Sequence, residues 1–480
     1  MPTPRRIALL TVCILSIAAL GAASEVQAAG FEFAGNSAMG LGRGMALTAS
    51  VDDSTAIAHN PGLLSQLDGT QLQWSHQIAY AHETFTRAPS QVPQKSIAGA
   101  TTAEALAPSS NKAPLFPLGV FLAASRRVSA NWTVAVAGYG PSGIGFKEFD
   151  SQGGQRYMLT KLDLLIAYAS LAVAYGKKDK FGVGATMQWA MMPKTDMSLV
   201  VDAATGGAQN PYYAGSDVVA TIRLADMTAF SAIMGAWWQV SPNLRVAASG
   251  RVIPVYFDAE GDLALSNDRD GVGAKFTPTQ LSVSGSKAHL KMAIAPTCAI
   301  GARWVNLNAS GTETWDVEAN IVWEGWSIID AYEVKTEGKI NMFAKKEFPT
   351  VTIAKKWRDT VALRVGGTYW ASDAMGVSAG GYIEQGATPH NYSHLDFPSF
   401  NRLGLGGGIR YKGQSINGNL SYVHVFQETR EVSEAYGKVT QQRPMSPCPE
   451  DCDGFDNIPA NAGKFETGYD MLSLSVAYKF

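Results

Sequence analysis

The stretch MLSLSVAYKF, residues 471–480, decides the fold class. Apolar side chains occupy every second position from Leu472 to Phe480, and serine, alanine or lysine stands between them from Ser473 to Lys479. This alternation is typical of a strand with one apolar and one polar face. In a transmembrane β-barrel the apolar row faces lipid and the other row faces the lumen. The stretch therefore predicts a membrane-spanning strand.

Comparable runs recur through the chain before this stretch, separated by turn signals. We count fourteen runs in all, with this stretch in the last of them. They begin near Gln71, Phe116, Asn131, Thr160, Phe181, Val218, Asn243, Gln280, Glu313, Pro349, Val361, Asn401, Ser415 and Tyr469. The segment Ser378–Ile383 is interpreted as a loop or as an extension of its neighbour. The pattern predicts an all-β fold, a fourteen-stranded antiparallel transmembrane β-barrel.

Short and long connections alternate between these runs. Short ones lie at about 125–131, 176–180, 241–243, 306–312, 358–360 and 412–414, and long ones at about 87–115, 142–159, 193–217, 258–279, 330–349, 372–399 and 429–467. Short periplasmic turns and long outer loops are typical of up-and-down barrels of the outer membrane. After residue 28 no run of about 18 apolar residues occurs, so the sequence predicts spanning by strands rather than by helices.

The alternation also sorts charges, since a charge facing lipid at mid-membrane costs roughly 2–4 kcal/mol. It assigns Leu244, Val246, Ala248 and Val252 to lipid and Arg245, Ser249 and Arg251 to the lumen. It assigns Leu290, Met292 and Ile294 to lipid and His289 and Lys291 to the lumen, and it turns Arg364, Arg402 and Arg410 inward. Arg251 and Lys291 are candidates for binding a ligand carboxylate on this ground alone.

The N-terminal 28 residues have the features of a signal peptide. Arg5 and Arg6 precede an apolar run over 7–23, and Val26-Gln27-Ala28 supplies the small residues of a cleavage site. An uncleaved anchor is the alternative, but the run is at the lower edge of what spans a bilayer. Removing two Arg and one Glu changes the net charge from −2 to −3, which does not favour nucleic acid as a partner.

The segment AGFEFAGNSAMGLGRGMALTASVDDSTAIAHNPGLLSQL, residues 29–67, interrupts the β pattern. It is rich in glycine, alanine, serine and asparagine and shows no strand alternation. We expect residues 29–69 to form a plug, here called the hatch, inside a barrel built by residues 70–480. The GLGRG sequence at 40–44 lacks the spacing of a phosphate-binding loop.

Two cysteines, Cys448 and Cys452, lie close together in PCPEDCDGFDN. In an oxidising compartment they predict a small disulfide loop. The alternative is a metal site with the aspartates at 451, 453 and 456, whose spacing matches no known ligand motif, and we predict no metal or other cofactor. Cys298 is expected to be a small buried or lipid-facing residue.

Gly138, Gly140 and Pro141 end the third predicted strand. Glycine weakens a strand and proline removes a donor from the ladder, so this run predicts a kink that distorts pairing with a neighbour and opens the wall sideways. The alternative is that these residues simply begin a long loop.

With these features the chain resembles the FadL/TodX family of outer-membrane transporters for long-chain fatty acids and other hydrophobic compounds. The matching segments are 29–31, 37–43, Asp52-Asp53, Asn60-Pro61, 138–149 and 472–480. The family has Asn-Pro-Ala in the hatch where this chain has Asn60, Pro61 and Gly62, and glycine adds backbone freedom there.

The resemblance implies a fourteen-stranded barrel, a hatch and a lateral exit at a kinked third strand. Phe31 matches the hatch aromatic near the family's high-affinity ligand site. The expected function is passive, ligand-gated uptake of hydrophobic molecules across the outer membrane of a Gram-negative bacterium. The alternatives are a porin-like channel for polar solutes, and an outer-membrane lipase, although no GxSxG motif occurs.

The expected partners follow from this function. They are a hydrophobic small molecule, outer-membrane lipid and lipopolysaccharide, and the barrel assembly machinery, whose C-terminal signal the strand ending at Phe480 resembles. We expect a monomer that is not an enzyme.

Overall fold

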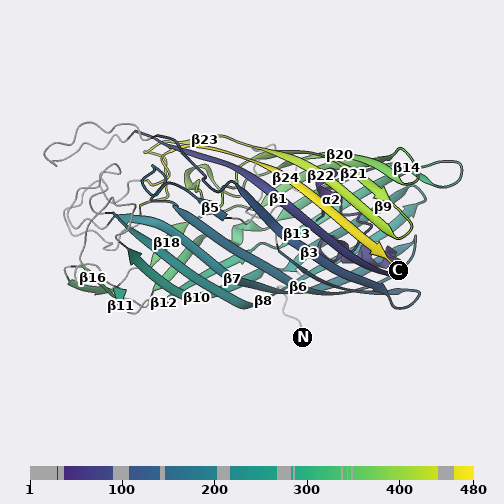
Figure 1. Cartoon of the computed structure of the whole chain (residues 1–480), viewed down its shortest axis with the longest axis horizontal. Helices are drawn as coiled ribbons and strands as arrows, with labels where there is room; N and C mark the ends of the chain where they lie inside the picture. Colours follow the sequence, from purple (N-terminus) through teal and green to yellow (C-terminus); the bar gives the residue numbers. More distant parts are fainter. Residues whose placement is uncertain are drawn as a thin grey trace.

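The computed structural model describes residues 30, 37–89, 107–140, 146–202, 217–266, 283–284, 287–336, 339–342, 344–347, 350–441 and 459–480. These residues form a long barrel of tilted strands, with the C-terminus and the short turns at one end (Figure 1). The short-turn end is the periplasmic end of such a barrel, and the opposite end faces outward. The predicted signal peptide lies outside the described residues.

Fourteen antiparallel strands build a closed wall, as predicted. Around the barrel they are β1 (Thr70–Arg87), β3 (Leu115–Arg127), β4 (Trp132–Tyr139) with β5 (Phe146–Glu148), β6 (Lys161–Lys177), β7 (Phe181–Asp202), β8 (Asp217–Ser241), β9 (Leu244–Ile253) with β10 (Val255–Ser266), β13 (Thr297–Leu307) with β12 (Lys287–Ile294), β14 (Glu313–Glu324) with β15 (Ala331–Thr336), β19 (Thr360–Trp370) with β18 (Val351–Ala354), β20 (Met375–Glu384), β21 (Arg402–Lys412), β22 (Ile416–Gln427) with β23 (Arg430–Val432), and β24 (Gly463–Lys479). β24 pairs with β1 from Lys479 to Gly463 and closes the wall.

Smaller elements accompany the wall. β2 (Ser109–Ser110) pairs with β1, and β11 (Val283–Ser284), β16 (Lys339–Met342) and β17 (Ala344–Glu347) form a separate antiparallel sheet. The helices are α2 (Ala38–Gly42), α3 (Ala56–His59) and the 3₁₀ turns η1 (Pro61–Gln66), η2 (Trp326–Ile328) and η3 (His390–Tyr392). None of the helices in the described ranges has the length and apolar character of a membrane span.

Four neighbouring wall strands are each divided in two. Pro254 separates β9 from β10, Pro296 lies between β12 and β13, residues 325–330 separate β14 from β15, and residues 355–359 separate β18 from β19. Proline cannot donate to a ladder, so it stops regular pairing at the first two breaks. The outer pieces pair in the order β10–β12–β15–β18, continuing from β8. We call these four pieces the outer extension.

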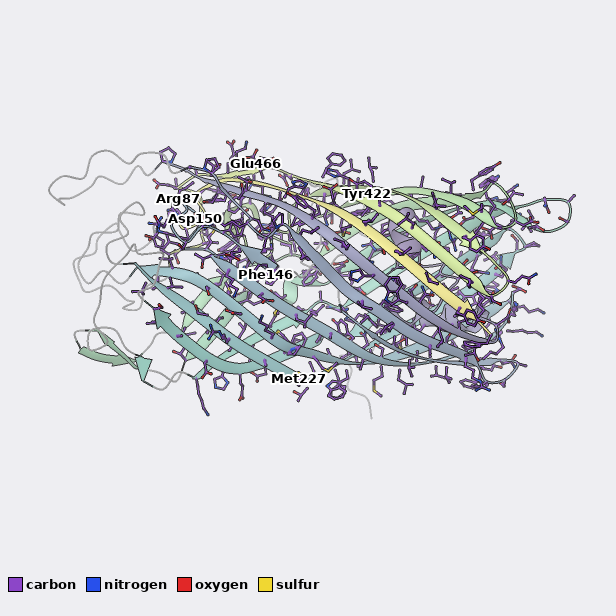
Figure 2. All side chains as sticks on the ribbon, viewed as in Figure 1. Arg87, Phe146, Asp150, Met227, Tyr422 and Glu466 are labelled. Atoms are coloured by element: carbon purple, nitrogen blue, oxygen red, sulfur yellow. The ribbon has the colours of Figure 1, made fainter. Side chains whose placement is uncertain are left out.

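The predicted alternation of lipid-facing and lumen-facing rows is confirmed in β24. Leu472, Leu474, Val476 and Tyr478 are exposed, whereas Ser473 and Ser475 are buried. β1 and β4 alternate in the same way. Side chains project outward around the barrel, Met227 and Tyr422 among them (Figure 2).

Two details of the predicted strand set are wrong. The runs beginning near Pro349 and Val361 are β18 and β19, the two parts of one wall strand, so residues 358–360 form a break rather than a periplasmic turn. The segment Ser378–Ile383, taken as loop or extension, belongs to the full strand β20 and pairs with both β19 and β21. The total is unchanged because the two errors cancel.

The hatch lies inside this wall. Its hydrogen bonds reach strands spaced around the barrel: Ser54 to Ser125 of β3, Ile57 to Thr186 of β7, Arg43 to Asp316 of β14, and Asp52 to Arg410 of β21. Helix α2 appears within the ribbon of the barrel (Figure 1). All of residues 37–51 are buried, so their glycines and alanines serve close packing.

Leu474 tests the assignment of the lipid-facing row. We expect Leu474→Arg to weaken folding into lipid vesicles by about 2–4 kcal/mol, because a charge would face hydrocarbon. Glu466 lies on the same face of β24 where charged groups already stand, so Glu466→Arg is the matched control and should change little. Urea-dependent folding into vesicles measures both, and equal effects would contradict the assignment.

Candidate functional site

A buried arginine fixes the hatch to the wall. Arg43 is the C-cap of α2, and its side chain is fully buried. Its Nη1 and Nη2 atoms donate to the two carboxylate oxygens of Asp316 at 2.8 and 2.6 Å, and Nη1 also donates to the Thr368 hydroxyl at 2.7 Å. Arg303 donates to the same carboxylate from the wall at 2.8 Å. A two-pronged arginine–carboxylate contact fixes direction as well as distance, so it sets the orientation of the hatch.

A second ionic contact holds the middle of the hatch. Arg410 Nη2 lies 2.8 and 2.9 Å from the two carboxylate oxygens of Asp52, and Lys412 is 3.4 Å away. Burial alone would raise the pKa of Asp52, but Arg410 and Lys412 hold it well below its usual range. Burial and the neighbouring Asp52 instead raise the pKa of Asp53. Burial lowers the pKa of His59 to about 4, so this histidine is neutral at pH 7.

The predicted hatch motif Asn60-Pro61-Gly62 packs directly against β7 and β8. Asn60 accepts from the Gly62 amide at 3.1 Å and donates to the Thr48 carbonyl at 2.7 Å, while Pro61 occupies the first turn of η1. A Cβ at Gly62 would lie 2.8 Å from the carbonyl oxygen of Gly235. Glycine is therefore required here by the close approach of the wall and does not serve to loosen the backbone.

The start of the hatch lies beside an aromatic cluster. A Cβ on Gly30 would fall 2.4 Å from the indole ring of Trp326. Trp326 packs edge-on against Trp357, and Tyr332 and Phe397 pack edge-on against that same tryptophan. All four aromatic residues are buried. The predicted ligand residue Phe31 lies outside the described residues, directly after this contact in the sequence.

The connection between β20 and β21, residues 385–401, packs across the outer end of the barrel. Lys355, which follows β18, donates to Asp396 at 2.7 Å, and Lys147 of β5 donates to the Leu395 carbonyl at 3.1 Å. Arg430 of β23 donates to the Thr388 carbonyl at 2.7 Å. Because β5, β18 and β23 belong to different sides of the wall, this connection covers part of the outer opening.

The connection contains a buried ion pair between Asp396 and Lys355. Burial alone would raise the pKa of Asp396, but His394 and Lys355 hold it far below its usual range. The carboxylate of Asp396 thus stays ionised and neutralises Lys355. The two side chains are almost fully buried, so their pairing keeps the connection attached to the wall.

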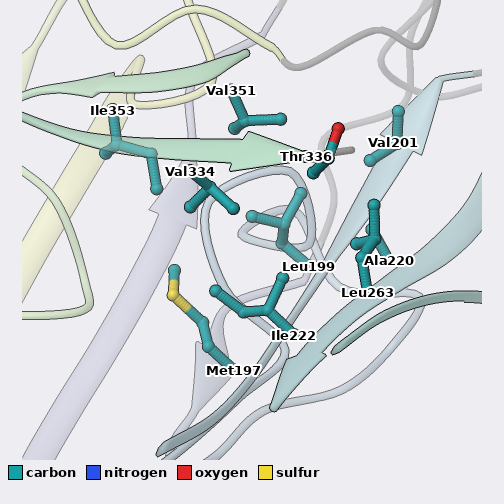
Figure 3. A pocket seen from close by; sticks show the side chains of 10 residues that line it. All are labelled: Met197, Leu199, Val201, Ala220, Ile222, Leu263, Val334, Thr336, Val351 and Ile353. Carbon is teal, nitrogen blue, oxygen red and sulfur yellow. The ribbon is translucent and has the colours of Figure 1, made fainter. Parts of the chain in front are cut away.

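An apolar pocket lies on the inner side of the outer extension (Figure 3). It is partly open, and the space within it, counted together with adjoining open solvent, is about 510 Å³. Its lining comes from β7, β8, β10, β15 and β18: Met197, Leu199, Val201, Ala220, Ile222, Leu263, Val334, Thr336, Val351 and Ile353. Nine of these ten side chains are hydrocarbon or thioether, so the pocket suits an apolar ligand.

The outer face of the same strands is charged, and this corrects the prediction for β12. Leu290 and Met292 are buried toward the lumen, whereas Lys291 is exposed on the outer face opposite Asp258 of β10. Ile294, also assigned to lipid, is buried as well. The outer extension meets water instead of lipid, so its apolar row turns inward and its charged row outward. Lys291 therefore does not line the lumen.

The other predicted basic residues do face the lumen. Arg245 donates to the hatch carbonyl of Ala49 at 3.4 Å, and Arg364 and Arg402 pair with Glu384. Arg251 shares the inward side of β9 with Ser249 and donates to the Ala295 carbonyl at 3.2 Å, next to the break between β12 and β13. Its predicted role toward a ligand carboxylate stays a prediction.

The strand ladder is interrupted beside Gly138 and Gly140. Pairing of β3 with β4 ends at Leu122 and Gly138, and pairing of β4 with β6 ends at Tyr139 and Tyr168. β6 regains a partner only at Asp163, opposite β5. Within the described residues, 115–121 of β3 and 164–167 of β6 thus have no strand partner on this side. Pro141 lies outside the described residues.

A groove lies in the outer face of the wall next to this break. Gly138 is on the outward row of β4, and a Cβ there would point into open space and meet no heavy atom within 4 Å. A cavity here touches residues whose side chains alternate between the two faces of β1, β3, β4, β6 and β24: Leu72, Gln73, Trp74, Leu122, Ala123, Ala124, Val136, Ala137, Gly138, Ala169, Ser170, Val476 and Tyr478. Small residues such as Ala124, Gly138 and Ala169 form part of its surface.

These observations place an apolar lumen pocket, a fixed plug and an interrupted wall in one barrel, and comparison with known proteins identifies the family. The sequence model of outer membrane protein transport proteins (OMPP1/FadL/TodX) matches residues 19–445, most of the chain. The protein belongs to the OMPP1/FadL/TodX family. The predicted resemblance is thereby confirmed, and with it the outer membrane location and a transport role in place of an enzymatic one.

Individual members of the OMPP1/FadL/TodX family are distant from this chain. A putative outer membrane protein of Neisseria meningitidis serogroup B is 22% identical over 494 residues, covering 97% of this chain and 98% of that protein. The crystal structure of a Pseudomonas aeruginosa FadL homologue has a TM-score of 0.73 at 16% identity and covers 94% of this chain and 100% of its own. The P. putida toluene transporter TodX has a TM-score of 0.63 at 13% identity, with 95% and 99% covered. The two structures share the fold.

Some expectations fall on other parts of the chain. Cys448 and Cys452 lie outside the described residues, and Cys298 is half-buried. The described ranges contain no group of three or more His, Cys, Asp or Glu side chains arranged to hold a metal ion. Sequence reasoning missed the Arg43–Asp316 contact and the apolar pocket. The only sequence signal for the ion pair was the charge of Arg43 within an otherwise apolar, glycine-rich segment. The only signal for the pocket was that the strands forming it keep an apolar face beyond the part of the barrel that crosses the membrane.

A substitution of Arg43 tests whether its ion pair with Asp316 holds the hatch against the wall. Arg43→Met should weaken hatch docking by about 3–5 kcal/mol, since it removes one partner of a buried ion pair at Asp316. Arg127→Met is the control, because Arg127 donates to the hatch carbonyls of Leu67 and Ser65 but leaves no buried carboxylate behind. Protease cleavage of the hatch in increasing urea measures docking. Equal sensitivity of the two variants would contradict the role of the ion pair.

Proposed function

We propose that this protein is a passive channel through which hydrophobic small molecules enter the outer membrane. A molecule binds in the apolar pocket of the outer extension and leaves sideways through the break between β3, β4 and β6. The proposal draws support from the family match and from a fold shared with a toluene transporter and a FadL homologue.

One observation supports a route from the pocket to the break. Met197 of the pocket pairs directly with Leu162 of β6. Leu164 and Ile166 continue the same inward face of β6, all three β6 residues are buried, and Ile166 lies at the interrupted ladder. The inward row of β6 is thus apolar from the pocket to the break, and the one charged group directly beside it among the described residues, Lys147 opposite Leu162, is neutralised by Glu83. A hydrophobic ligand on this path never has to expose its surface to water, which would cost the free energy gained by its burial.

The start of the hatch is the proposed sensor of the ligand. Gly30 touches Trp326, whose aromatic cluster includes Tyr332, and Val334 of the pocket follows on the same face of β15. Phe31 comes next in the chain. Arrival of a ligand at this cluster displaces the first hatch residues, while Arg43 and Asp52 keep the rest of the hatch fixed to the wall. The ligand is a fatty acid or an aromatic hydrocarbon, and the lipid-facing row contacts the surrounding membrane lipid.

Gly138 tests the lateral exit. Gly138→Trp should fold normally, because a Cβ on this outward position meets open space, and its indole ring should cover the lipid side of the break and stop release. We expect toluene and oleate uptake by whole cells to fall to the level of cells without the protein. Binding of the same ligands to purified protein should persist.

Gly407→Trp is the matched control, since Gly407 of β21 lies away from the break and a Cβ there makes only an ordinary contact with Ser378. It should leave uptake unchanged. Normal uptake by the Gly138 variant would rule out this exit. Sugar conductance through the purified protein would instead favour a channel for polar solutes.

A further inference from the structure

The groove beside the break crosses the lipid-facing side of β24, β1, β3, β4 and β6. Its small residues Ala124, Gly138 and Ala169 lie among larger apolar side chains such as Trp74 and Val136. It has about 710 Å³ of accessible space and is open toward the lipid, whereas ligand sites in proteins have roughly 300–1,000 Å³. Its outward residues form two rows of paired neighbours, none of them charged: Tyr478, Leu72, Ala124 and Val136, and Val476, Trp74, Leu122, Gly138 and Ala169. The groove therefore suits a hydrocarbon chain.

The groove lies in the periplasmic half of the membrane band. Leu72 and Trp74 stand near the periplasmic start of β1, whereas the exposed apolar row of that strand continues to Tyr80. Trp132 and Tyr175, whose ring centroids are 5.0 Å apart, lie at the periplasmic ends of β4 and β6, as aromatic residues at a membrane boundary do. In a Gram-negative outer membrane the periplasmic leaflet consists of phospholipid, and lipopolysaccharide is confined to the outer leaflet. Phospholipid is therefore the lipid that meets this groove.

A single cation stands at the periplasmic end of the groove on β3. Arg126 continues the outward row of that strand past the groove residues, one residue before the strand ends, and it is exposed. Its neighbours across the ladder, Thr70 and Val134, carry no charge. The carboxylate of Asp68 is bound to Arg127 at 3.5 Å. Among the described residues Arg126 has no ion pair, so its guanidinium can bind an anion of the membrane.

The distance from this cation to the break matches one lipid leaflet. From Arg126 to Leu122 the strand rises about 13 Å, which at a tilt of about 40° is roughly 10 Å of membrane depth. The apolar band of an outer-membrane barrel is about 25 Å tall, so one leaflet contributes about 12 Å. Leu122 pairs with Gly138, the last residue of β4 that has a partner on β3. A chain whose head group lies at Arg126 therefore extends to the break.

We propose that the groove and Arg126 form a binding site for one phospholipid of the periplasmic leaflet, with its phosphate on the guanidinium and an acyl chain along Ala124 and Gly138. A guanidinium binds two phosphate oxygens at once, and the stem of an arginine lies on apolar surface while its charged end reaches the head groups. The bound chain lies against the interrupted ladder and covers the break from the lipid side. The site rests on the shape and charge of the wall and goes beyond the proposed transport.

Native mass spectrometry tests the site without any transport. The detergent-solubilised barrel is titrated with phosphatidylglycerol and, in parallel, with a diacylglycerol that has the same chains and no phosphate. We expect one phosphatidylglycerol to bind before all others, and Arg126→Gln to weaken this first binding about tenfold, because a charged hydrogen bond to phosphate is lost. Arg223→Gln is the matched control, since Arg223 is an exposed arginine of β8 that pairs with β10, away from the groove. It should bind as the unaltered protein does.

A second pair of variants tests the groove itself. Ala124→Trp should fill the groove and weaken the first binding to a similar extent. Ala302→Trp, on the exposed row of β13 between Ile300 and Trp304, should have no effect. Heat-dependent mobility on a gel shows whether each variant is a folded barrel, and Arg126→Gln decides alone if Ala124→Trp does not fold.

A phosphatidylglycerol with a photoreactive diazirine in its chain locates the bound lipid. Cross-links should fall on residues 134–138, and cross-links spread evenly over the exposed rows would overturn the proposal. So would the absence of a first binding step in the unaltered protein, diacylglycerol binding as tightly as phosphatidylglycerol, or equal affinities of Arg126→Gln and Arg223→Gln. None of these measurements depends on uptake, so a protein that failed to take up toluene or oleate would refute the proposed function and leave the lipid site to be decided by its own results.

Discussion

The structure depends on the pairing of backbone amides and carbonyls around the barrel. In lipid no water satisfies an unpaired backbone group, so every strand must have a partner on both sides, and β24 must return to β1. Fourteen strands make a lumen wide enough to need filling, and the hatch fills it through Arg43, Asp52 and Asn60. Against this requirement, the stretches of β3 and β6 beside Gly138 that have no strand partner within the described residues are costly.

The fold could be predicted wherever lipid dictates the pattern. β24 was predicted correctly because its lipid-facing row from Leu472 to Tyr478 has no interruption. β20 was missed because Gly380 and Gly381 erase its alternation. For Gly380 the reason lies outside the strand, because a Cβ there would lie 2.3 Å from the backbone of Arg43, whereas a Cβ at Gly381 would meet Leu405 of β21 at 2.9 Å. A contact with the hatch, distant in sequence, therefore requires glycine at position 380.

The candidate site was less predictable, because some of its residues lie in the lumen and others lie in the outer extension, where different rules decide which way a side chain points. Arg245, Arg364, Arg402 and Arg410 were correctly turned inward, because a charge is excluded from lipid. Lys291 was not, because the outer extension stands in water and the rule reverses there. The partners of the inward arginines could not be predicted from the sequence either. Asp316 is far from Arg43 in the sequence, and no local pattern links them.

The division of four neighbouring strands has a consequence for how such a protein diversifies. Each break, such as those at Pro254 and Pro296, resets the backbone between the membrane band and the outer extension. Insertions or new side chains in β10, β12, β15 and β18 therefore leave the register of β9, β13, β14 and β19 undisturbed. The outer pieces can therefore change in length and side chains while the inner pieces keep their pairing.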